Sequence, residues 1–182
     1  MNVENKLVSI AFKLCQLMDK EAEKFLPQEI AKVVQTHSKM AVASAWIPVP
    51  GADVAAGAVT IWTMYGRINN KLGISIGDNI LKTIASGVAT NLASYAAMAG
   101  VASALKFIPG IGTFGGAIIL SASLYGITLT SGYIYLKALC LLAEKDHGKI
   151  DFNNLDEVVN DILSNSHLVK DFLNEAKKSY KK

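Results

Sequence analysis

A long run almost without charge is the feature that most constrains this chain. No acidic residue occurs between Asp78 and Glu144, and between Lys82 and Lys137 the only charged residue is Lys106. An apolar stretch of this length has to be buried in lipid or in protein, because exposed apolar area of that size drives association. The sequence therefore predicts either a membrane-directed segment or an unusually apolar protein core.

The composition indicates a folded and hydrophobic chain. Of the 182 residues, 51% are hydrophobic and 18% are charged, which excludes disorder for the body of the chain. The net charge of +3 is modest and lysines gather at the C-terminal end, a pattern that fits an anionic membrane face better than nucleic acid. Cys15 and Cys140 lie in apolar helical contexts, typical of buried thiols in a reducing compartment. We expect no signal peptide, because charges are scattered through the N-terminal residues.

Apolar residues recur at three- and four-residue steps, which predicts helices throughout and no strand. The expected helices cover 3–25, Pro27 to Trp46, Asp53 to about Lys71, Asp78 to Lys106 and Thr113 to about Lys145, followed by short helices over 154–163 and 166–178. Gly73 is expected to end the third helix, and Asn154 and Ser166 to cap the last two. The predicted regions are amphipathic helices over 1–38, an apolar core over 39–147 and an amphipathic hairpin over 148–182, which resembles a soluble appendage.

The apolar core contains an internal repeat. A Pro-Gly turn precedes a helix cap twice, and a Tyr-Gly pair follows each cap. The residues concerned are Pro48, Pro50, Gly51, Asp53, Tyr65 and Gly66 in the first copy and Pro109, Gly110, Gly112, Thr113, Tyr125 and Gly126 in the second. The repeat predicts an all-α bundle with two similar Pro-Gly-turn hairpins of apolar helices and outer amphipathic helices. Gly112 and Gly116 form a Gly-xxx-Gly pair, which is expected at a close helix contact.

Motifs for catalysis are lacking. The string Gly110 to Gly115 matches a dinucleotide fingerprint, yet no strand precedes it and no acid follows at the required spacing. His37, His147 and His167 have no carboxylate or cysteine at metal-ligand spacing, and we expect all three to be solvated. The serines and threonines of the apolar helices are expected to hydrogen-bond between helices. The sequence therefore predicts a protein that is not an enzyme, with no catalytic residue, cofactor or metal.

Two sets of residues allow alternative interpretations. Asp53, the one carboxylate in the apolar block 40–77, is either an intramembrane acid on an ion path or a helix cap. The cap is favoured, because the neutral Thr113 occupies the equivalent repeat position. The tyrosines and tryptophans either form an interfacial belt or fill a core, and both interpretations stay open.

Several motifs, in a fixed order, resemble a known family. They are Ile47-Pro48-Val49-Pro50-Gly51-Ala52-Asp53, Met64-Tyr65-Gly66-Arg67, Phe107-Ile108-Pro109-Gly110-Ile111-Gly112, Tyr125-Gly126 and Gly132-Tyr133. Over residues 43–136 the chain resembles the bacterial domain of unknown function 697, a family with YcjF-like inner-membrane proteins and segments appended to GTPases. The resemblance implies an all-helical, membrane-associated module encoded with or fused to a GTPase, and no established activity. Since this sequence has no GTPase motif, a nucleotide-dependent role would need a separate partner.

Two functional hypotheses follow. In the first, the apolar hairpins insert in the bacterial cytoplasmic (inner) membrane, where the module anchors or regulates a separate GTPase or forms a homo-oligomeric assembly. Positive charges flank the apolar blocks as this orientation requires, at Lys39, Arg67, Lys71, Lys82 and Lys137. In the second, a soluble bundle sheathes the apolar hairpins, binds a protein partner, or inserts into a membrane on a trigger as colicin-type pore formers do. Neither hypothesis involves nucleic acid.

Overall fold

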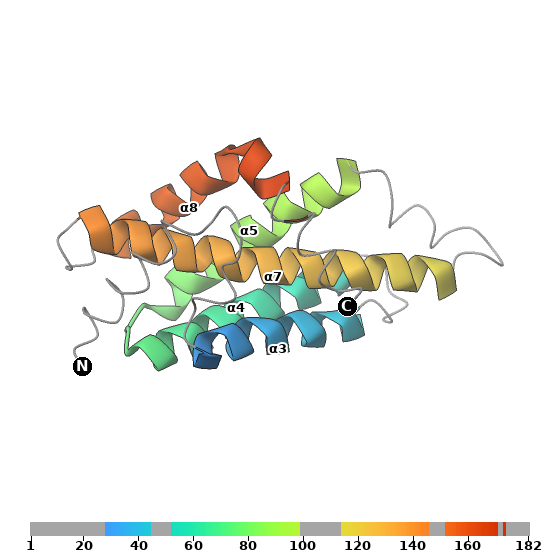
Figure 1. Cartoon of the computed structure of the whole chain (residues 1–182), viewed down its shortest axis with the longest axis horizontal. Coiled ribbons are helices and arrows are strands. Elements are labelled where there is room, and N and C mark those ends of the chain that lie inside the picture. Colours follow the sequence, from blue (N-terminus) through green and yellow to red (C-terminus); the bar gives the residue numbers. More distant parts are fainter. Residues whose placement is uncertain (1–27, 45–51, 99–113, 146–151, 171–172, 174–182) are drawn as a thin grey trace.

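The structure is a computed structural model that describes residues 28–44, 52–98, 114–145, 152–170 and 173. In chain order its elements are α3 (Gln28–Ser44), α4 (Ala52–Leu72), α5 (Asp78–Met98), α7 (Phe114–Lys145), the 3-10 helix η1 (Phe152–Asn154) and α8 (Leu155–Ser164) (Figure 1). No described residue lies in a strand, so the predicted all-α bundle is confirmed for this part of the chain. The expected helix over 3–25 and both Pro-Gly turns lie outside the described residues.

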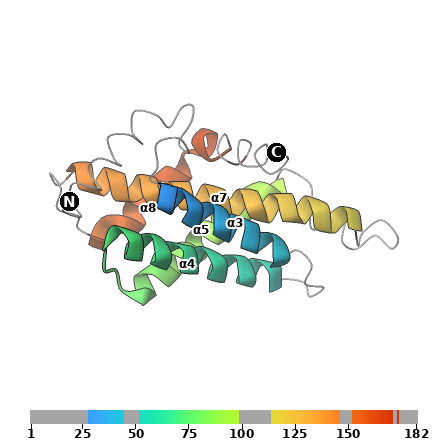
Figure 2. The same ribbon diagram turned by 60° about the horizontal axis from the view of Figure 1, so that its bottom comes forward.

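Helix α7 is the central element of the bundle. It packs against α3, α4, α5 and α8, and Figure 2 shows α3 and α4 side by side on one side of it. Every residue from 123 to 143 is buried or half-buried, and Ile134, Leu139 and Leu142 have no exposed surface. A helix that is apolar on all sides must be covered on all sides. In this fold the long uncharged run of the sequence is therefore covered, over these residues, by other helices of the same chain.

Helix α3 is amphipathic and meets α7 at a glycine. Ile30, Val34 and Ala41 are buried, whereas Lys32 and Lys39 on the other face are exposed. A Cβ atom added at Gly132 of α7 would lie 2.7 Å from Cγ1 of Val34, closer than real Cβ contacts. The absence of a side chain at Gly132 thus lets the two helices approach closely.

Helices α4 and α5 form a hairpin with a tight turn. Gly73 has a φ of 70°, a left-handed conformation that glycine adopts without steric penalty. The N–H of Gly73 donates to the carbonyl of Asn70 and that of Ile74 to the carbonyl of Asn69, at 3.4 and 2.9 Å. These two bonds are the Schellman pattern that ends a helix. The predicted helix end at Gly73 is confirmed.

The hairpin is also joined through side chains on its two helices. Lys82 of α5 places its Nζ 4.6 Å from the ring centroid of the half-buried Trp62 of α4, which is a cation–π contact. On the other side of α4, Lys71 lies 3.4 Å from a carboxylate oxygen of Glu29 on α3. Both members of that ion pair are exposed, so it adds little stability.

The C-terminal segment shares the core of the central helices. Leu155, Val159, Ile162 and Leu163 of α8, with Val169 and Leu173 beyond it, are buried in the same apolar cluster as α7 and α5. The segment predicted as an appendage is thus packed on the bundle through its apolar face.

Of the two predicted caps of the C-terminal helices, Asn154 has the predicted N-cap position without a capping bond, and Ser166 is wrong. Asn154 precedes α8, yet its side chain makes no capping hydrogen bond. For the turn of helix over 166–170, the cap is Asn165 and not Ser166, because Asn165 Oδ1 accepts from the N–H of Leu168 at 3.1 Å. Asn and Ser cap about equally well, so the composition alone does not select between neighbours.

Candidate functional site

The structure describes only some of the predicted motif residues. Tyr65 and Gly66 lie in α4, and Tyr125 and Gly126 in α7. Asp53 and Gly116 belong to the first turns of α4 and α7, but the Asp53 side chain and the surroundings of Gly116 lie outside the described part. The residues outside it altogether are Pro48, Pro50, Gly51, Pro109, Gly110, Gly112 and Thr113. The cap at Asp53 and the close contact of Gly112 with Gly116 therefore stay predictions.

A stacked tyrosine pair lies in the α4–α7 interface. The rings of Tyr65 and Tyr135 are 4.0 Å apart and inclined by 11°, and neither ring has exposed surface. Tyr65 Oη donates to the backbone carbonyl of Ser131 at 3.3 Å, and Tyr135 Oη donates to Oδ1 of Asn69 at 2.8 Å. Each helix thus gives one phenol and accepts one hydrogen bond in return.

The pair holds its protons firmly. Burial raises the pKa of Tyr65 far above its ordinary value, because a phenolate would be desolvated there. The hydrogen bond to Ser131 opposes this effect only in part. A neutral, hydrogen-bonded phenol locks the register of two helices and supplies no acid or base at physiological pH. The pair is therefore structural in this state.

His37 is buried, so the prediction that all three histidines are solvated is wrong for this residue. Its side chain is 1% exposed on the inner face of α3. Nδ1 lies 2.7 Å from the carbonyl oxygen of Val33, to which it donates, and Nε2 has no hydrogen-bond partner among the described residues. His167 is exposed as predicted, and His147 lies outside the described part.

The burial of His37 changes its acidity. Burial lowers its pKa below the ordinary 6.5, the hydrogen bond to Val33 opposes this, and the positive charge of Arg67 lowers the pKa further.

The sequence contains a signal for the burial of His37. His37 falls three and seven residues after Val34 and Ile30, the spacing of the buried face of an amphipathic helix.

Hydroxyl groups are numerous inside the bundle. Ser131 Oγ donates to the carbonyl of Thr128 and Ser38 Oγ to that of Val34, each at 2.8 Å and within the same helix. The predicted interhelical role is wrong for these two side chains, because each satisfies its hydroxyl on the preceding turn.

Aromatic side chains fill the core in the described part. Tyr125 is buried, while Tyr95, Tyr133 and Trp62 are half-buried against the apolar cluster. This arrangement favours the interpretation of core filling over that of an interfacial belt.

Polar clusters suited to catalysis do not occur in the described part of the chain. No group of three or more His, Cys, Asp or Glu side chains there could hold a metal ion. Cys140 is fully buried, as its apolar context predicted. A shallow pocket of about 300 Å³ lies between the starts of α5 and α8, lined by Asn79, Ile80, Thr83, Ile84, Phe152, Asn153 and Asp156. The hydroxyl of Thr83 in this lining donates to the carbonyl of Asn79 on the preceding turn, at 3.0 Å.

The most distinctive element is therefore α7 itself. Its segment Ser123–Ala143 is long and apolar enough to cross a membrane, and 83% of the apolar window is buried inside the bundle. The core helix of a soluble protein has the same properties, so length and composition are weak evidence by themselves.

Comparison with known proteins identifies the family to which the chain belongs. Neither the curated proteins nor the solved structures gave a match. A family model described as a domain of unknown function matches residues 11–167 and so extends well beyond the motifs between 43 and 136. Its span includes α3, the hairpin, α7 and α8. The chain therefore belongs to the family Domain of unknown function (DUF697).

Proposed function

We propose that this protein is a non-enzymatic module of the bacterial cytoplasmic membrane that stores α7 inside a sheath of amphipathic helices and releases it into the bilayer. The sheath consists of α3, α4, α5 and α8. In the stored state the protein is cytoplasmic and associates with the membrane surface. The observation that carries the proposal is a membrane-length apolar helix that is enclosed by four helices with polar outer faces.

The dimensions of α7 support this function. A helix rises 1.5 Å per residue, so the 21 residues Ser123–Ala143 span about 30 Å, the thickness of a hydrocarbon core. Lys137 is the one charged residue in this span and lies six residues before its end at Ala143, so its long side chain would have to extend toward the interface. Lipid tails are as apolar as leucine side chains. Exchanging helix contacts for lipid contacts therefore changes the burial of α7 little.

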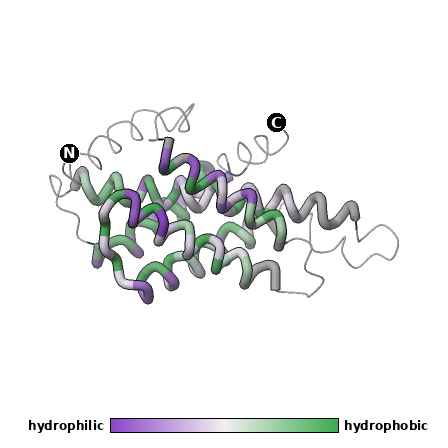
Figure 3. Tube along the Cα trace, turned by 90° about the horizontal axis from the view of Figure 1, so that it is seen from below, coloured by the Kyte–Doolittle hydropathy of each residue, from purple (hydrophilic) through white to green (hydrophobic). Residues whose placement is uncertain are grey.

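The outer surface supports a stored state. Among the described residues, the large hydrophobic side chains that are exposed are Met40, Val59 and Ile80. The remaining exposed positions of α3, α4 and α5 are mostly polar or charged. Figure 3, viewed from the side of α3 and α4, shows hydrophilic stretches along both helices. Such a surface suits water, whereas a permanently inserted bundle would present apolar faces to lipid.

A disulfide that locks the sheath tests the proposal. A Cβ at Gly132 would touch the γ carbons of Val34, so cysteines at these two positions face each other within disulfide range. The variant V34C/G132C would be prepared with C15S, and mass spectrometry would verify the new bond. Thermal unfolding of the oxidised and reduced forms would establish that both are folded.

The measurement is insertion into vesicles of phosphatidylethanolamine and phosphatidylglycerol. We expect the reduced variant to resist carbonate extraction, with its α7 shielded from protease by the bilayer. The oxidised variant should stay extractable. If the reduced variant and the parent both remain extractable, α7 does not insert and the proposal is wrong. If the oxidised variant inserts with its disulfide intact, the release of α7 from α3 is wrong.

A further inference from the structure

The outward faces of α3 and α4 form one surface, here called the basic face. The two helices are antiparallel neighbours, because Glu29 near the start of α3 contacts Lys71 at the end of α4. Farther along, Val34 and Met64 both lie within 3.3 Å of the Cβ position of Gly132. The exposed side chains of this face are Glu29, Lys32, Thr36, Lys39, Met40 and Ala43 on α3 and Val59, Thr63, Arg67, Asn70 and Lys71 on α4.

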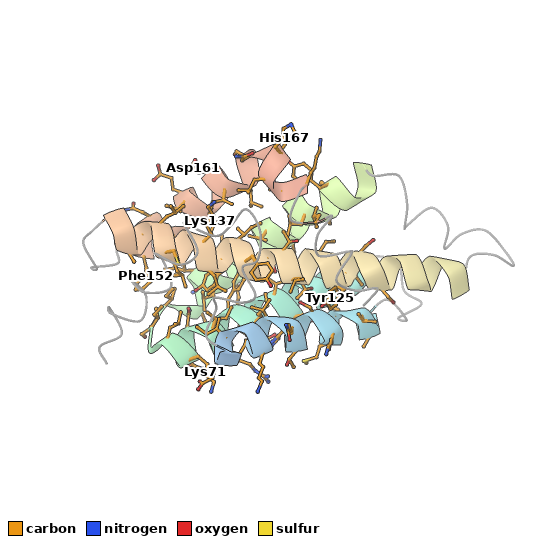
Figure 4. The ribbon with its side chains drawn as sticks, in the orientation of Figure 1. Lys71, Tyr125, Lys137, Phe152, Asp161 and His167 are labelled. Carbon is orange, nitrogen blue, oxygen red and sulfur yellow. The ribbon has the colours of Figure 1, made fainter. Side chains whose placement is uncertain are left out.

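Charge is distributed unevenly between the basic face and the opposite side of the molecule. The basic face carries Lys32, Lys39, Arg67 and Lys71, against the single acid Glu29, which is already paired with Lys71. Across the bundle, α8 exposes Asp156, Glu157 and Asp161. Figure 4 shows Lys71 and Asp161 on opposite sides of α7. Apart from Lys170, which follows α8, the exposed charges named on that side are acidic, whereas those of the basic face are mostly cationic.

The basic face also has an apolar end. Met40 is 53% exposed and Val59 is 56% exposed. Each lies about three helical turns from the ion pair of Glu29 with Lys71, counted along its own helix, so the antiparallel register places both at the same end of the face. Exposed large apolar side chains beside lysines are the pattern of surfaces that lie in the headgroup region of a bilayer.

We propose that the basic face docks on the surface of a bilayer that contains anionic lipids, with Met40 and Val59 entering the headgroup region. This inference rests on the proposed function and names the face through which the stored protein meets the membrane. Lysine ammonium and arginine guanidinium groups spread along two helices meet a plane of lipid phosphates, and each contributes independently. The cationic side chains of the basic face are exposed and spread along two helices, an arrangement that suits a plane of charge.

Vesicle binding of charge variants tests the docking face. Each cation near an anionic surface changes the partition coefficient about fivefold, so K32Q/K39Q/R67Q is expected to bind vesicles of phosphatidylcholine with 30% phosphatidylglycerol about a hundredfold more weakly than the parent. The matched control is K170Q, an exposed lysine after α8, which should change binding less than twofold. M40S/V59S should weaken binding severalfold while the salt dependence stays unchanged.

Three outcomes would overturn the docking face. A loss of about fivefold in K170Q, the same loss per removed charge as in the triple variant, would mean that net charge alone matters. Binding to a polyglutamate peptide without binding to the vesicles would reassign the face to an acidic protein partner. An unchanged affinity of all variants would remove the face from membrane binding, even if α7 still inserts.

The same samples separate this inference from the proposed function. A parent protein that binds vesicles through the basic face but remains carbonate-extractable would retain the docking face and contradict the release of α7. Circular dichroism of each variant, which should match the parent because the substituted side chains are exposed, checks the fold.

Discussion

Helices α3 and α7 are neighbours that are buried in different ways, and the contrast explains much of the molecule. α7 is apolar on every side and is enclosed over residues 123–143, whereas α3 is buried on one side and exposes charges on the other. Yet the one-sided helix, not the enclosed one, buries an ionisable imidazole, that of His37. The packing of α7 thus depends on shape and neutral hydrogen bonds, whereas the packing of α3 depends also on the protonation state of His37. The predictions below test that difference.

The contact between the two helices at Gly132 should be the most sensitive point. Gly132→Leu would place carbon atoms where the γ carbons of Val34 already lie, at 2.7 Å from the first added atom. We expect the free energy of unfolding to fall by about 3 kcal/mol through overpacking. Urea denaturation followed by circular dichroism would measure the loss.

The control for this variant is Gly87→Ala on α5, where an added Cβ meets no atom within 4 Å. That change should stabilise the protein by about 0.5–1 kcal/mol, because alanine favours a helix. A Gly132→Leu protein as stable as the parent would show that α3 and α7 do not meet as described.

Removing a hydrogen bond of the tyrosine pair should cause the next largest loss in the free energy of unfolding. Tyr135→Phe leaves both side-chain groups of Asn69 unsatisfied in the core, since Nδ2 has no partner among the described residues. We expect a loss of about 2 kcal/mol. Tyr65→Phe should lose less, about 0.5–1 kcal/mol, because its bond is longer and ends on a backbone carbonyl.

A double-mutant cycle separates the bond from the ring. Adding Asn69→Leu to Tyr135→Phe should recover part of the loss, since replacing both partners leaves no orphaned polar group. Strict additivity of the two substitutions would mean that the bond from Tyr135 to Asn69 contributes nothing.

Protonation of His37 on α3 should lower the stability of the fold. The pKa of His37 is lowered in the folded state, so between that value and 6.5 the unfolded chain binds more protons. Stability should therefore decline as the pH falls below about 6.5, by at most about 1.4 kcal/mol per pH unit for one proton. Thermal unfolding from pH 7.5 to pH 5 would record the slope.

His37→Leu should flatten this pH dependence, because leucine does not titrate and has no orphaned polar atom. His167→Gln, at an exposed position, should leave the slope as it is. A slope that persists in His37→Leu would assign the acid sensitivity to other groups.

The smallest effect is expected at the ion pair between α3 and α4. Lys71→Gln removes a partner of Glu29, but the two side chains are 51% and 74% exposed, so water and salt already screen the pair. We expect a change below about 0.5 kcal/mol. A loss above 1 kcal/mol in chemical denaturation would mean that the pair is less solvated than described.

Local patterns predicted much of the fold. The apolar periodicity predicted α3, α4 and α7, and Gly73 marked a helix end, because these signals arise from neighbours along the chain. The long uncharged run predicted that its residues would be covered.

The pairing of distant residues could not be predicted in the same way. The repeat makes Tyr65 and Tyr125 equivalent along the chain but does not predict which residues they contact. Tyr65 stacks on Tyr135, because the register between two helices is decided by packing and not by a spacing within the sequence. The prediction that His37 is solvated is wrong for a related reason. Its polar neighbours along the chain, such as Lys39, suggested water, while its helix face determined burial.

The cation–π contact between Lys82 and Trp62 provides a fluorescence signal for the α4–α5 hairpin. An indole with an ammonium group 4.6 Å from its ring centroid has an emission that depends on that charge and on the solvent around it. With Trp46 replaced by Phe, Trp62 becomes the sole indole of the chain, since the sequence has two tryptophans. Its fluorescence would then follow the separation of α4 from α5 in real time, without an added label.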